Sequence, residues 1–332
     1  MRPLGKDEAV RIVLDGMGGD HAPAEVVKGA VGASLEYGVE VVLVGKRDML
    51  EGELRQLQAS SRISIVDASD AVDFNDQPSK VRHLKDSSIM VAMNLLKSGE
   101  AQALVSAGNT GAVMAAALFV LGRIKGFERP ALCAIFPTLS PDLLLIIDVG
   151  ANADCKPHQL VQFAQMGTTY MERVFGMKSP RVGLLSNGEE DTKGNQLVRD
   201  AHKAMGKTGL NFIGNIEGKD IWAGVADVVV TDGFTGNVLI KASEGFSALA
   251  LNFLKQTLQS RLEFRIPGFL LNPALAEFKK RMDYSEYGGV PLLGVDGNVI
   301  CAHGRSDAKA IKNAIRIANQ GMEQGMPEAM RR

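Results

Sequence analysis

Short apolar segments alternate with longer amphipathic segments along most of the chain. Strand-like apolar runs cover residues 10–14, 39–44 and 63–66, and helical patterns cover residues 23–37 and 47–58. An apolar run of about four to eight residues is typical of a buried strand, whereas apolar residues three and four positions apart are typical of a helix. The first part of the chain is therefore predicted to run strand, helix, strand, helix, strand.

The same alternation returns further along the chain. More strand-like runs cover residues 103–106, 131–136, 143–148, 181–185, 211–216 and 225–231. Because these runs are apolar on both faces, we expect a mostly parallel sheet with helices on both sides. The predicted fold class is α/β, a Rossmann-like multi-layer α/β/α arrangement. No linker or change of composition divides the chain, so residues 1–332 are expected to form a single two-lobed domain.

A protruding helical hairpin is predicted within this domain, at residues 236–284. A long helical pattern starts near Gly236 and another covers residues 273–284, with Pro267 and Gly268 interrupting the helix between them. The predicted tip carries six large apolar residues: Leu262, Phe264, Ile266, Phe269, Leu270 and Leu271. Such a tip predicts either a dimer contact or a segment that enters the membrane interface.

Composition and charge exclude several classes of partner. The 332 residues include 37 basic and 38 acidic side chains, so no overall charge favours nucleic acid, and we expect no nucleic-acid partner. Cys133, Cys155 and Cys301 are too widely spaced for a disulfide framework or a Cys-x-x-Cys metal site, which favours a reducing cytosol. No apolar run reaches the length of about 20 residues that spans a bilayer, so a cytoplasmic location is expected.

Segments rich in glycine, asparagine, threonine and aspartate follow the apolar runs. They cover residues 15–20, 106–112, 148–152, 186–195, 231–237 and 287–307. Such residues turn tightly, expose backbone N–H groups and cap the helix that follows. Each segment by itself is explained equally well as a helix cap. Because ligands bind beyond the carboxyl ends of parallel strands, the whole set predicts one cleft that binds phosphate or another small oxyanion.

Common nucleotide and hydrolase motifs are absent from the sequence. The glycines at 16, 18 and 19 do not fit the G-x-G-x-x-G spacing, "AMGKTG" lacks the first glycine of a P-loop, and no G-x-S-x-G elbow occurs. A dinucleotide site and a catalytic triad are therefore poorly supported. Of the five histidines, His21 and His303 lie in glycine-rich loops and are the better candidates for ligand contacts, whereas His202 lies within a helical pattern.

Several longer motifs resemble one protein family. The segments "MGGDHAP", "SAGNTGA", "GRIKGFERPAL", "DVGAN", "ADVVVTDGFTGN" and "AHGRSDAKAI", in this order, resemble the bacterial phosphate acyltransferases of phospholipid synthesis, the PlsX family. The resemblance covers the chain from about Val10 to the last helix. It implies that inorganic phosphate attacks the thioester of a fatty acyl-[acyl-carrier protein], which gives acyl phosphate and free carrier protein. It also implies a homodimer, no cofactor, and a fold similar to isopropylmalate dehydrogenase and phosphotransacetylase.

The resemblance assigns roles to individual residues. Lys193 is expected to bind phosphate and stabilise developing negative charge, and Asn237 is expected to bind the oxyanion. The other expected substrate-binding residues are Asp15, Gly18, Gly19, His21, Asn109, Thr110, Asn152, Asp232, His303, Gly304 and Ser306. The acids Asp15, Asp20, Asp148 and Asp232 fit two roles, orienting amides and lysines or holding a metal. Their spacing does not define a metal site, and we assign none.

The predicted hairpin also carries a cluster of basic residues. Residues expected to contact the acidic carrier protein or the membrane are Arg261, Arg265, Phe269, Leu270, Lys279, Lys280 and Arg281. We expect peripheral association with the inner face of the membrane, where a downstream membrane acyltransferase would use the acyl phosphate. Three alternatives stay open: a metal- and NAD-dependent decarboxylating dehydrogenase of the same architecture, an acyl-CoA phosphotransacylase, and a docking protein without catalytic activity.

Overall fold

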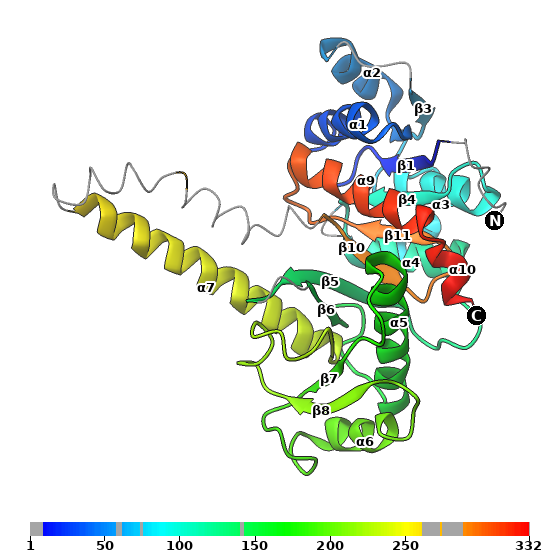
Figure 1. The fold of residues 1–332 in the computed structure, drawn as a ribbon. Helices are drawn as coiled ribbons and strands as arrows, with labels where there is room; N and C mark the ends of the chain where they lie inside the picture. The colour runs from blue at the N-terminus through cyan, green and yellow to red at the C-terminus, as the bar shows by residue number, and fades with distance from the viewer. Residues whose placement is uncertain are drawn as a thin grey trace.

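A twisted β-sheet runs through the whole molecule (Figure 1). The computed structural model describes residues 9–57, 62–73, 76–139, 143–260, 273 and 288–331. Within these residues, eleven strands form one sheet in the order β3-β2-β1-β4-β11-β10-β5-β6-β9-β7-β8. The first five strands in this order belong to the upper lobe of Figure 1, and β6, β9, β7 and β8 belong to the lower lobe. β10 and β5 join the two lobes.

Nine of the eleven strands, all except β10 and β11, agree closely with the apolar runs of the sequence. Their bounds are β1 (Arg11–Asp15), β2 (Glu40–Gly45), β3 (Ile63–Asp67), β4 (Ala103–Ser106), β5 (Ala131–Pro137), β6 (Leu143–Ile147), β7 (Val182–Leu185), β8 (Phe212–Ile216), β9 (Val228–Val230), β10 (Val290–Leu293) and β11 (Asn298–Cys301). Seven of the ten strand pairings are parallel, which confirms the predicted mostly parallel sheet.

Helices cover both faces of the sheet. Their bounds are α1 (Ala24–Tyr37), α2 (Arg47–Gln56), the short 3-10 helix η1 (Pro78–His83), α3 (Ser88–Ser98), α4 (Thr110–Val120), α5 (Pro157–Phe175), α6 (Gln196–Met205), α7 (Gly233–Ser260), α9 (Ala308–Glu323) and α10 (Met326–Met330). In the upper lobe, Ile12 and Leu14 of β1 pack toward α1 and α9, whereas Val13 packs toward α3 and α4. This alternation is what a strand buried on both faces requires, and it produces the predicted α/β/α layers.

The lower lobe repeats the same arrangement around β6. Leu145 and Ile147 pack against α5 on one face, where Phe163 is fully buried. Leu144 and Ile146 point to the other face and form a smaller core with residues of β8 and β9. Each lobe therefore has its own core on each side of the shared sheet.

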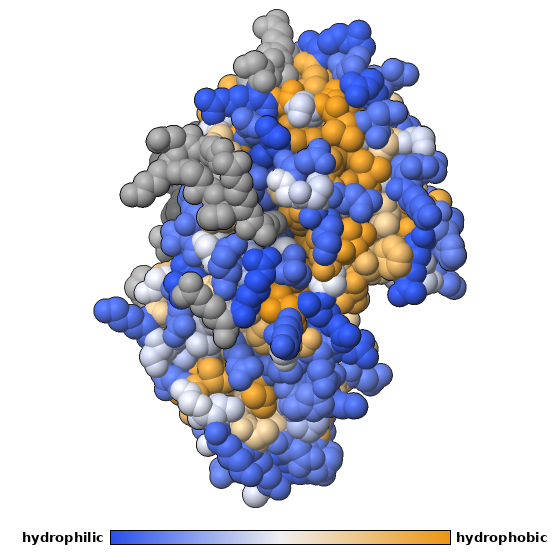
Figure 2. Space-filling model, turned by 90° about the vertical axis from the view of Figure 1, so that its right-hand side faces the viewer, coloured by the Kyte–Doolittle hydropathy of each residue, from blue (hydrophilic) through white to orange (hydrophobic). Residues whose placement is uncertain are grey.

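An apolar area lies on the surface of the upper lobe, on the side where α3 is seen in Figure 1 (Figure 2). The sequence of α4 is apolar on all sides, and its Phe119 is 57% exposed. The Arg82 guanidinium of η1 lies 5.7 Å from the centre of the Phe119 ring. α4 thus presents apolar side chains both to the core and to the surface.

Strand direction reverses between the two lobes. β11 and β10, β10 and β5, and β5 and β6 are each antiparallel, so β6 and its parallel neighbours run opposite to β1, β4 and β11. The carboxyl ends of the strands in the two lobes therefore lie at opposite edges of the sheet. Apolar runs do not encode strand direction, so the sequence did not predict this reversal; that all the strand-end segments line one cleft stays a prediction.

Helix α7 extends away from the lower lobe as a long arm (Figure 1). It covers Gly233–Ser260 and exposes several large apolar side chains: Val238, Phe246, Leu249, Phe253 and Leu254. Its start agrees with the predicted first helix of the hairpin. The predicted tip, and with it Arg261, Arg265, Phe269, Leu270, Lys279, Lys280 and Arg281, lies outside the described residues. Among the described helices, none has both the length and the apolar composition needed to cross a membrane.

Candidate phosphate-binding site

Three strand-end loops of the upper lobe meet around Asp15; we call them the upper loop group (residues 15–21, 106–112 and 303–306). Asp15 ends β1 and is only 3% exposed, and its Oδ2 accepts a 2.7 Å hydrogen bond from the Ser106 hydroxyl at the end of β4. The N–H of Asp20 donates to the carbonyl of Gly304, after β11, at 2.8 Å. A side chain at Gly18 would come within 2.7 Å of the backbone nitrogen of Gly108. Three loops far apart in the sequence are thus held together.

Asp15 itself is engaged inside this group. Burial raises its pKa, and hydrogen bonds from Ser88 and Ser106 act in the opposite direction, as do the backbone N–H groups of Met17 and Gly18. Both carboxylate oxygens therefore hold the loops in place. The sequence predicts that Asp15 binds substrate; in the structure its carboxylate hydrogen-bonds within the loop group, and the substrate contact stays a prediction.

The second set of loops, the lower loop group (residues 148–152 and 231–237), is built around Asp148 at the end of β6. Asp148 is fully buried, and its Oδ1 accepts hydrogen bonds from the N–H groups of Leu132, Gly150 and Ala151 at 2.9 to 3.1 Å. Its Oδ2 accepts from the backbone N–H and the side-chain amide of Asn152, at 2.7 and 2.8 Å. Burial raises the pKa of Asp148, against the effect of these donors.

The lower loop group also anchors the start of α7. The N–H of Gly233 donates to the carbonyl of Asn152 at 2.8 Å. The Asp232 carboxylate accepts from both the N–H and the hydroxyl of Thr235, at 2.9 and 2.7 Å, which satisfies donors in the first turn of the helix. Of the predicted ligands in this group, Asn152 and Asp232 are therefore engaged in loop and helix contacts, whereas Asn237 is exposed.

Helix α7 links the lower loop group to the upper one. A side chain at Gly150 would lie 3.9 Å from Asn237, so the Asn237 amide borders the loop after β6. Lys241 is one turn further along the helix, and its Nζ lies 3.4 Å from Nε2 of His303 in the upper loop group. Burial lowers the pKa of His303, and the positive charge of Lys241 lowers it further. Exposed polar and basic groups from both lobes thus meet at this junction.

Lys193 lies elsewhere, on the exposed loop between β7 and α6. Its side chain packs beside Gly188, and its backbone N–H donates to the carbonyl of Glu190 at 3.0 Å. The loop is held by the Asn215 side chain, which donates to the same carbonyl at 2.8 Å. In the described part of the chain, no hydrogen bond or ion pair joins Lys193 to Asn237. The two residues predicted to be catalytic are therefore not brought into contact.

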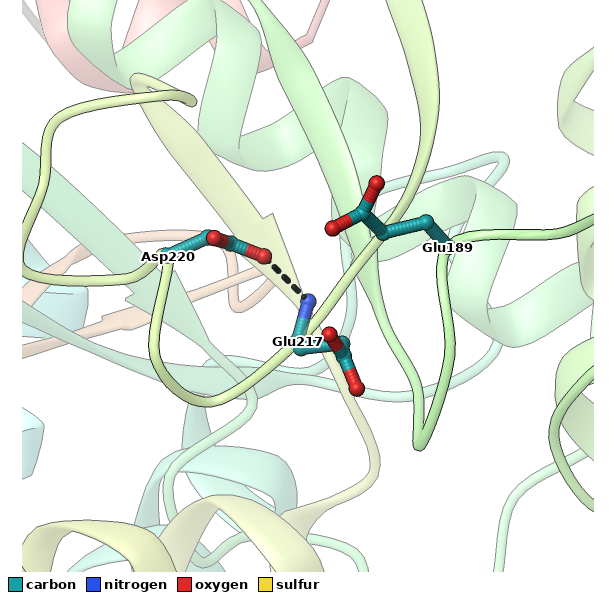
Figure 3. Close-up of side chains that lie close together, drawn as sticks. All are labelled: Glu189, Glu217 and Asp220. Atoms are coloured by element: carbon teal, nitrogen blue, oxygen red, sulfur yellow. Dashed lines mark hydrogen bonds between the residues drawn. The ribbon is translucent and has the colours of Figure 1, made fainter.

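An acidic cluster lies on the neighbouring loops after β7 and β8, formed by Glu189, Glu217 and Asp220 (Figure 3). The N–H of Glu217 donates to Asp220 at 2.9 Å. The Lys219 ammonium contacts both Glu217 and Glu189, and these carboxylates raise its pKa. The cluster is thus partly neutralised by a lysine of the same loop.

The remaining predicted ligands all belong to the upper loop group. Asn109 caps α4 by accepting the N–H of Ala112 at 3.0 Å, and His21 and Thr110 are exposed. Ser306 is 6% exposed. The sequence prediction did not name Lys241, which lies four residues after Asn237, on the same side of the helix.

Comparison with known proteins gives close relatives over nearly the whole chain. The model of a family described as "Fatty acid synthesis protein" matches residues 10–329. The phosphate acyltransferase of Pelotomaculum thermopropionicum is 48% identical over 97% of this chain and 94% of its own length. The phosphate acyltransferase of Heliobacterium modesticaldum is 50% identical over 97% of this chain and 96% of its own length.

The fold is also found in a more distant solved structure. A phosphotransacetylase from Streptococcus pyogenes matches with a TM-score of 0.65 at 17% identity, covering 96% of this chain and 95% of its own. At this identity the match concerns the fold alone. It confirms the Rossmann-like architecture expected from the sequence.

Proposed function

This chain belongs to the fatty acid synthesis protein family, and we propose that it is a phosphate acyltransferase of phospholipid synthesis. It forms acyl phosphate from a fatty acyl-[acyl-carrier protein] and inorganic phosphate. The observation that carries the proposal is the extent of the family match, which includes both loop groups and α7. The absence of any dinucleotide fingerprint in the sequence disfavours the alternative of an NAD-linked dehydrogenase.

The reaction needs little acid-base machinery. Phosphate near neutral pH is largely a dianion, so its oxygen is already a competent nucleophile. The phosphate oxygen bonds to the thioester carbonyl carbon, the carbonyl becomes an oxyanion, and the C–S bond then breaks with the thiolate as leaving group. The protein must hold phosphate against the thioester and place N–H donors or cations near the oxyanion. Asn237 and Lys193 are the residues we assign to the oxyanion and to the developing charge.

The decisive test follows release of free carrier protein from a purified acyl-carrier substrate. Release must depend on inorganic phosphate and must be accompanied by acyl phosphate, which hydroxylamine traps as the hydroxamate. Replacing the donor by acyl-CoA tests the phosphotransacylase alternative. NAD-dependent oxidation with no phosphate-dependent release would refute the proposal.

The assignment of Lys193 is tested by Lys193→Ala. Loss of one preorganised charged donor should lower turnover by roughly two to three orders of magnitude, with little change in stability because the side chain is exposed. Lys203→Ala, on the following helix α6, is the matched control. Turnover of Lys193→Ala within about threefold of the parent, at saturating phosphate, means that Lys193 has no such role.

We further propose that the protein acts as a homodimer and that α7 contributes to the contact between subunits. The exposed apolar side chains of α7, including Phe246 at 72% and Phe253 at 59%, support this arrangement because such residues are seldom left in water in a row. Phe246→Glu with Phe253→Glu should convert the dimer to a monomer in analytical ultracentrifugation. A parent protein that sediments as a monomer contradicts the proposal.

We propose that the enzyme is cytoplasmic and associates peripherally with the inner face of the membrane through residues 261–281. Apolar residues flanked by arginine and lysine are typical of segments that bind anionic lipid. Phe269→Glu together with Leu270→Glu should abolish flotation with anionic vesicles and leave soluble turnover and dimer mass unchanged. Loss of the dimer in this variant would assign the segment to the subunit contact instead.

A further inference from the structure

The short helix η1 lies along the outer side of α4, at the surface of the upper lobe. A side chain at Gly111, in the first turn of α4, would come within 2.6 Å of the Pro78 ring of η1. The Arg82 guanidinium lies 5.7 Å from the centre of the Phe119 ring, which is about 12 Å further along α4. η1 therefore follows α4 from its first turn to its last.

A surface hollow of about 510 Å³ opens on η1. The residues that line it are Asp76, Gln77, Ser79, Lys80, Arg82 and His83. The side-chain nitrogen of Asn109, in the upper loop group, lies 3.5 Å from the carbonyl oxygen of Asp76. The hollow thus begins directly beside the candidate phosphate-binding site, and nothing in the function described so far uses it.

Positive charge predominates in this hollow. Among the described residues that line it, Asp76 is the only acid, and its carboxylate accepts from Lys80 Nζ at 2.7 Å and from the N–H of Asp73 at 3.2 Å. The hydrogen bond from Lys80 lowers the pKa of Asp76. Arg82 and His83 are exposed, and neither forms an ion pair with an acid in the described part of the chain. An anionic surface would therefore find uncompensated positive charge here.

The outer side of α4 adds an apolar surface next to this charge. Phe119 is 57% exposed, and Met114, Ala115 and Leu118 are half-buried. The spacing of these four residues places them on one side of the helix, and Figure 2 shows an apolar area on the same lobe. Aromatic residues, methionine and arginine are the side chains most enriched where proteins bind one another. The combination is typical of a protein-binding surface.

We propose that η1 and the outer side of α4 form the docking surface for the acidic carrier protein that delivers the acyl chain. The inference rests on the proposed phosphate acyltransferase function and adds the place where its protein substrate binds. Arg82 and His83 meet carboxylates of the carrier protein, and Phe119 packs against an apolar side chain between them. A carrier protein bound here holds its thioester arm beside Asn109. A second copy of this chain, with a net charge of −1, offers no comparable charge complementarity.

The test measures binding of purified acyl-carrier protein to the full chain at low salt and without phosphate, so that it does not depend on turnover. Arg82→Glu should raise the Kd of the carrier protein by about tenfold, whereas Arg82→Lys, which keeps the charge, should raise it by less than about threefold. The effect of Arg82→Glu should shrink as added salt screens the charges. Phe119→Ala should raise the Kd by about fivefold, because it removes the apolar contact. Arg173→Glu, at an exposed arginine of α5, is the matched control and should leave the Kd unchanged.

Turnover gives a second measurement. Arg82→Glu should raise the KM for the acyl-carrier protein and leave the KM for inorganic phosphate unchanged, because the hollow binds only the protein substrate. Equal changes in both KM values would overturn the inference, since they would indicate a disturbed phosphate site rather than a lost docking contact.

The outcomes separate this inference from the proposed function. A Kd for Arg82→Glu within twofold of the parent at low salt overturns the inference, even where the parent turns over. A higher Kd for Lys279→Glu with Lys280→Glu, without one for Arg82→Glu, assigns docking to the predicted hairpin and also overturns it. Loss of dimer mass in Phe119→Ala with unchanged carrier affinity assigns α4 to a subunit contact instead. A parent that binds carrier protein through Arg82 but shows no phosphate-dependent release keeps the docking surface and refutes the enzymatic function.

Discussion

The two loop groups are each built around a buried aspartate at the end of a strand, but they are held in different ways. Asp148 of the lower group accepts hydrogen bonds from five N–H donors, four on the backbone and one on the side-chain amide of Asn152. Asp15 of the upper group accepts from the hydroxyls of Ser88 and Ser106 and from more distant backbone donors, such as Met17 N–H at 3.3 Å. A hydroxyl can rotate, whereas a backbone N–H is fixed by the chain.

This difference has a mechanical consequence. The lower group joins a strand, a loop and the first turns of α7 through fixed donors, so it forms a rigid base for Asn237 and Lys241. The upper group is joined by hydroxyls and by contacts between loops, and it can adjust more readily. The predictions below test how rigid each group is.

The largest effect is expected at Gly236 in the first turn of α7. A Cβ at this position would overlap the carbonyl oxygen of Asp148, which belongs to the backbone and cannot move without displacing the lower loop group. Gly236→Ala should therefore lower the free energy of unfolding by about 3 kcal/mol or more, and should impair phosphate binding with it. Urea denaturation gives the stability, and calorimetry gives the affinity.

Gly245→Ala is the matched control on the same helix. A Cβ at Gly245 meets nothing within 4 Å, so alanine should raise the free energy of unfolding by about 0.5 to 1 kcal/mol through its helix propensity. Equal destabilisation by both substitutions would mean that α7 itself is intolerant of change, and that the contact with Asp148 is not the cause.

A smaller difference in the loss of stability is expected between the variants Asp148→Asn and Asp15→Asn. Asp148→Asn must turn an NH2 group either toward three backbone N–H donors or toward the backbone N–H and the side-chain amide of Asn152, which should cost about 2 to 3 kcal/mol of stability. In Asp15→Asn, the hydroxyls of Ser88 and Ser106 can rotate and accept from the new NH2 group, so the cost should be about 1 kcal/mol or less. Denaturation of the two variants under identical conditions measures the contrast. A larger loss for Asp15→Asn would reverse our view of which group is rigid.

The sequence predicted the elements of the fold better than their arrangement. Strands such as β2 and β4 were predicted almost to the residue, because buried parallel strands are continuous apolar runs. β10 and β11 were missed, because both lie in a glycine-rich segment that was interpreted as one strand-end loop. Their antiparallel pairing reverses the sheet, and no local pattern specifies this reversal.

For the candidate site, the sequence likewise predicted the positions of residues in loops better than their contacts. Residues such as Asn109 and Gly304 were placed in glycine-rich strand-end loops, and the structure has them there. Residue type alone did not distinguish aspartates whose carboxylates orient loops from residues whose side chains a ligand can reach. The distinction depends on how deeply each side chain is buried in the folded protein. The contact of Lys241 with His303, 62 residues away, was not predicted, because no local pattern specifies it.

The smallest expected effect concerns the pH dependence of the Asp15→Asn variant. Burial raises the pKa of Asp15 in the folded protein above its ordinary value of 3.8, so the folded parent binds more protons than the unfolded chain between these two pKa values. The contribution of Asp15 to stability is therefore fully present below pH 3.8 and is lost as the pH rises through the raised pKa. Asparagine does not titrate, so the stability deficit of Asp15→Asn relative to the parent should shrink as the pH rises from about 3 to about 7. The other titratable groups behave alike in the parent and in Asp15→Asn. Their contributions therefore cancel in the difference between the two free energies of unfolding, which urea denaturation measures. A deficit that grows with pH would show that the folded upper group favours the carboxylate, and that the hydrogen bonds of Ser88 and Ser106 outweigh the effect of burial on Asp15.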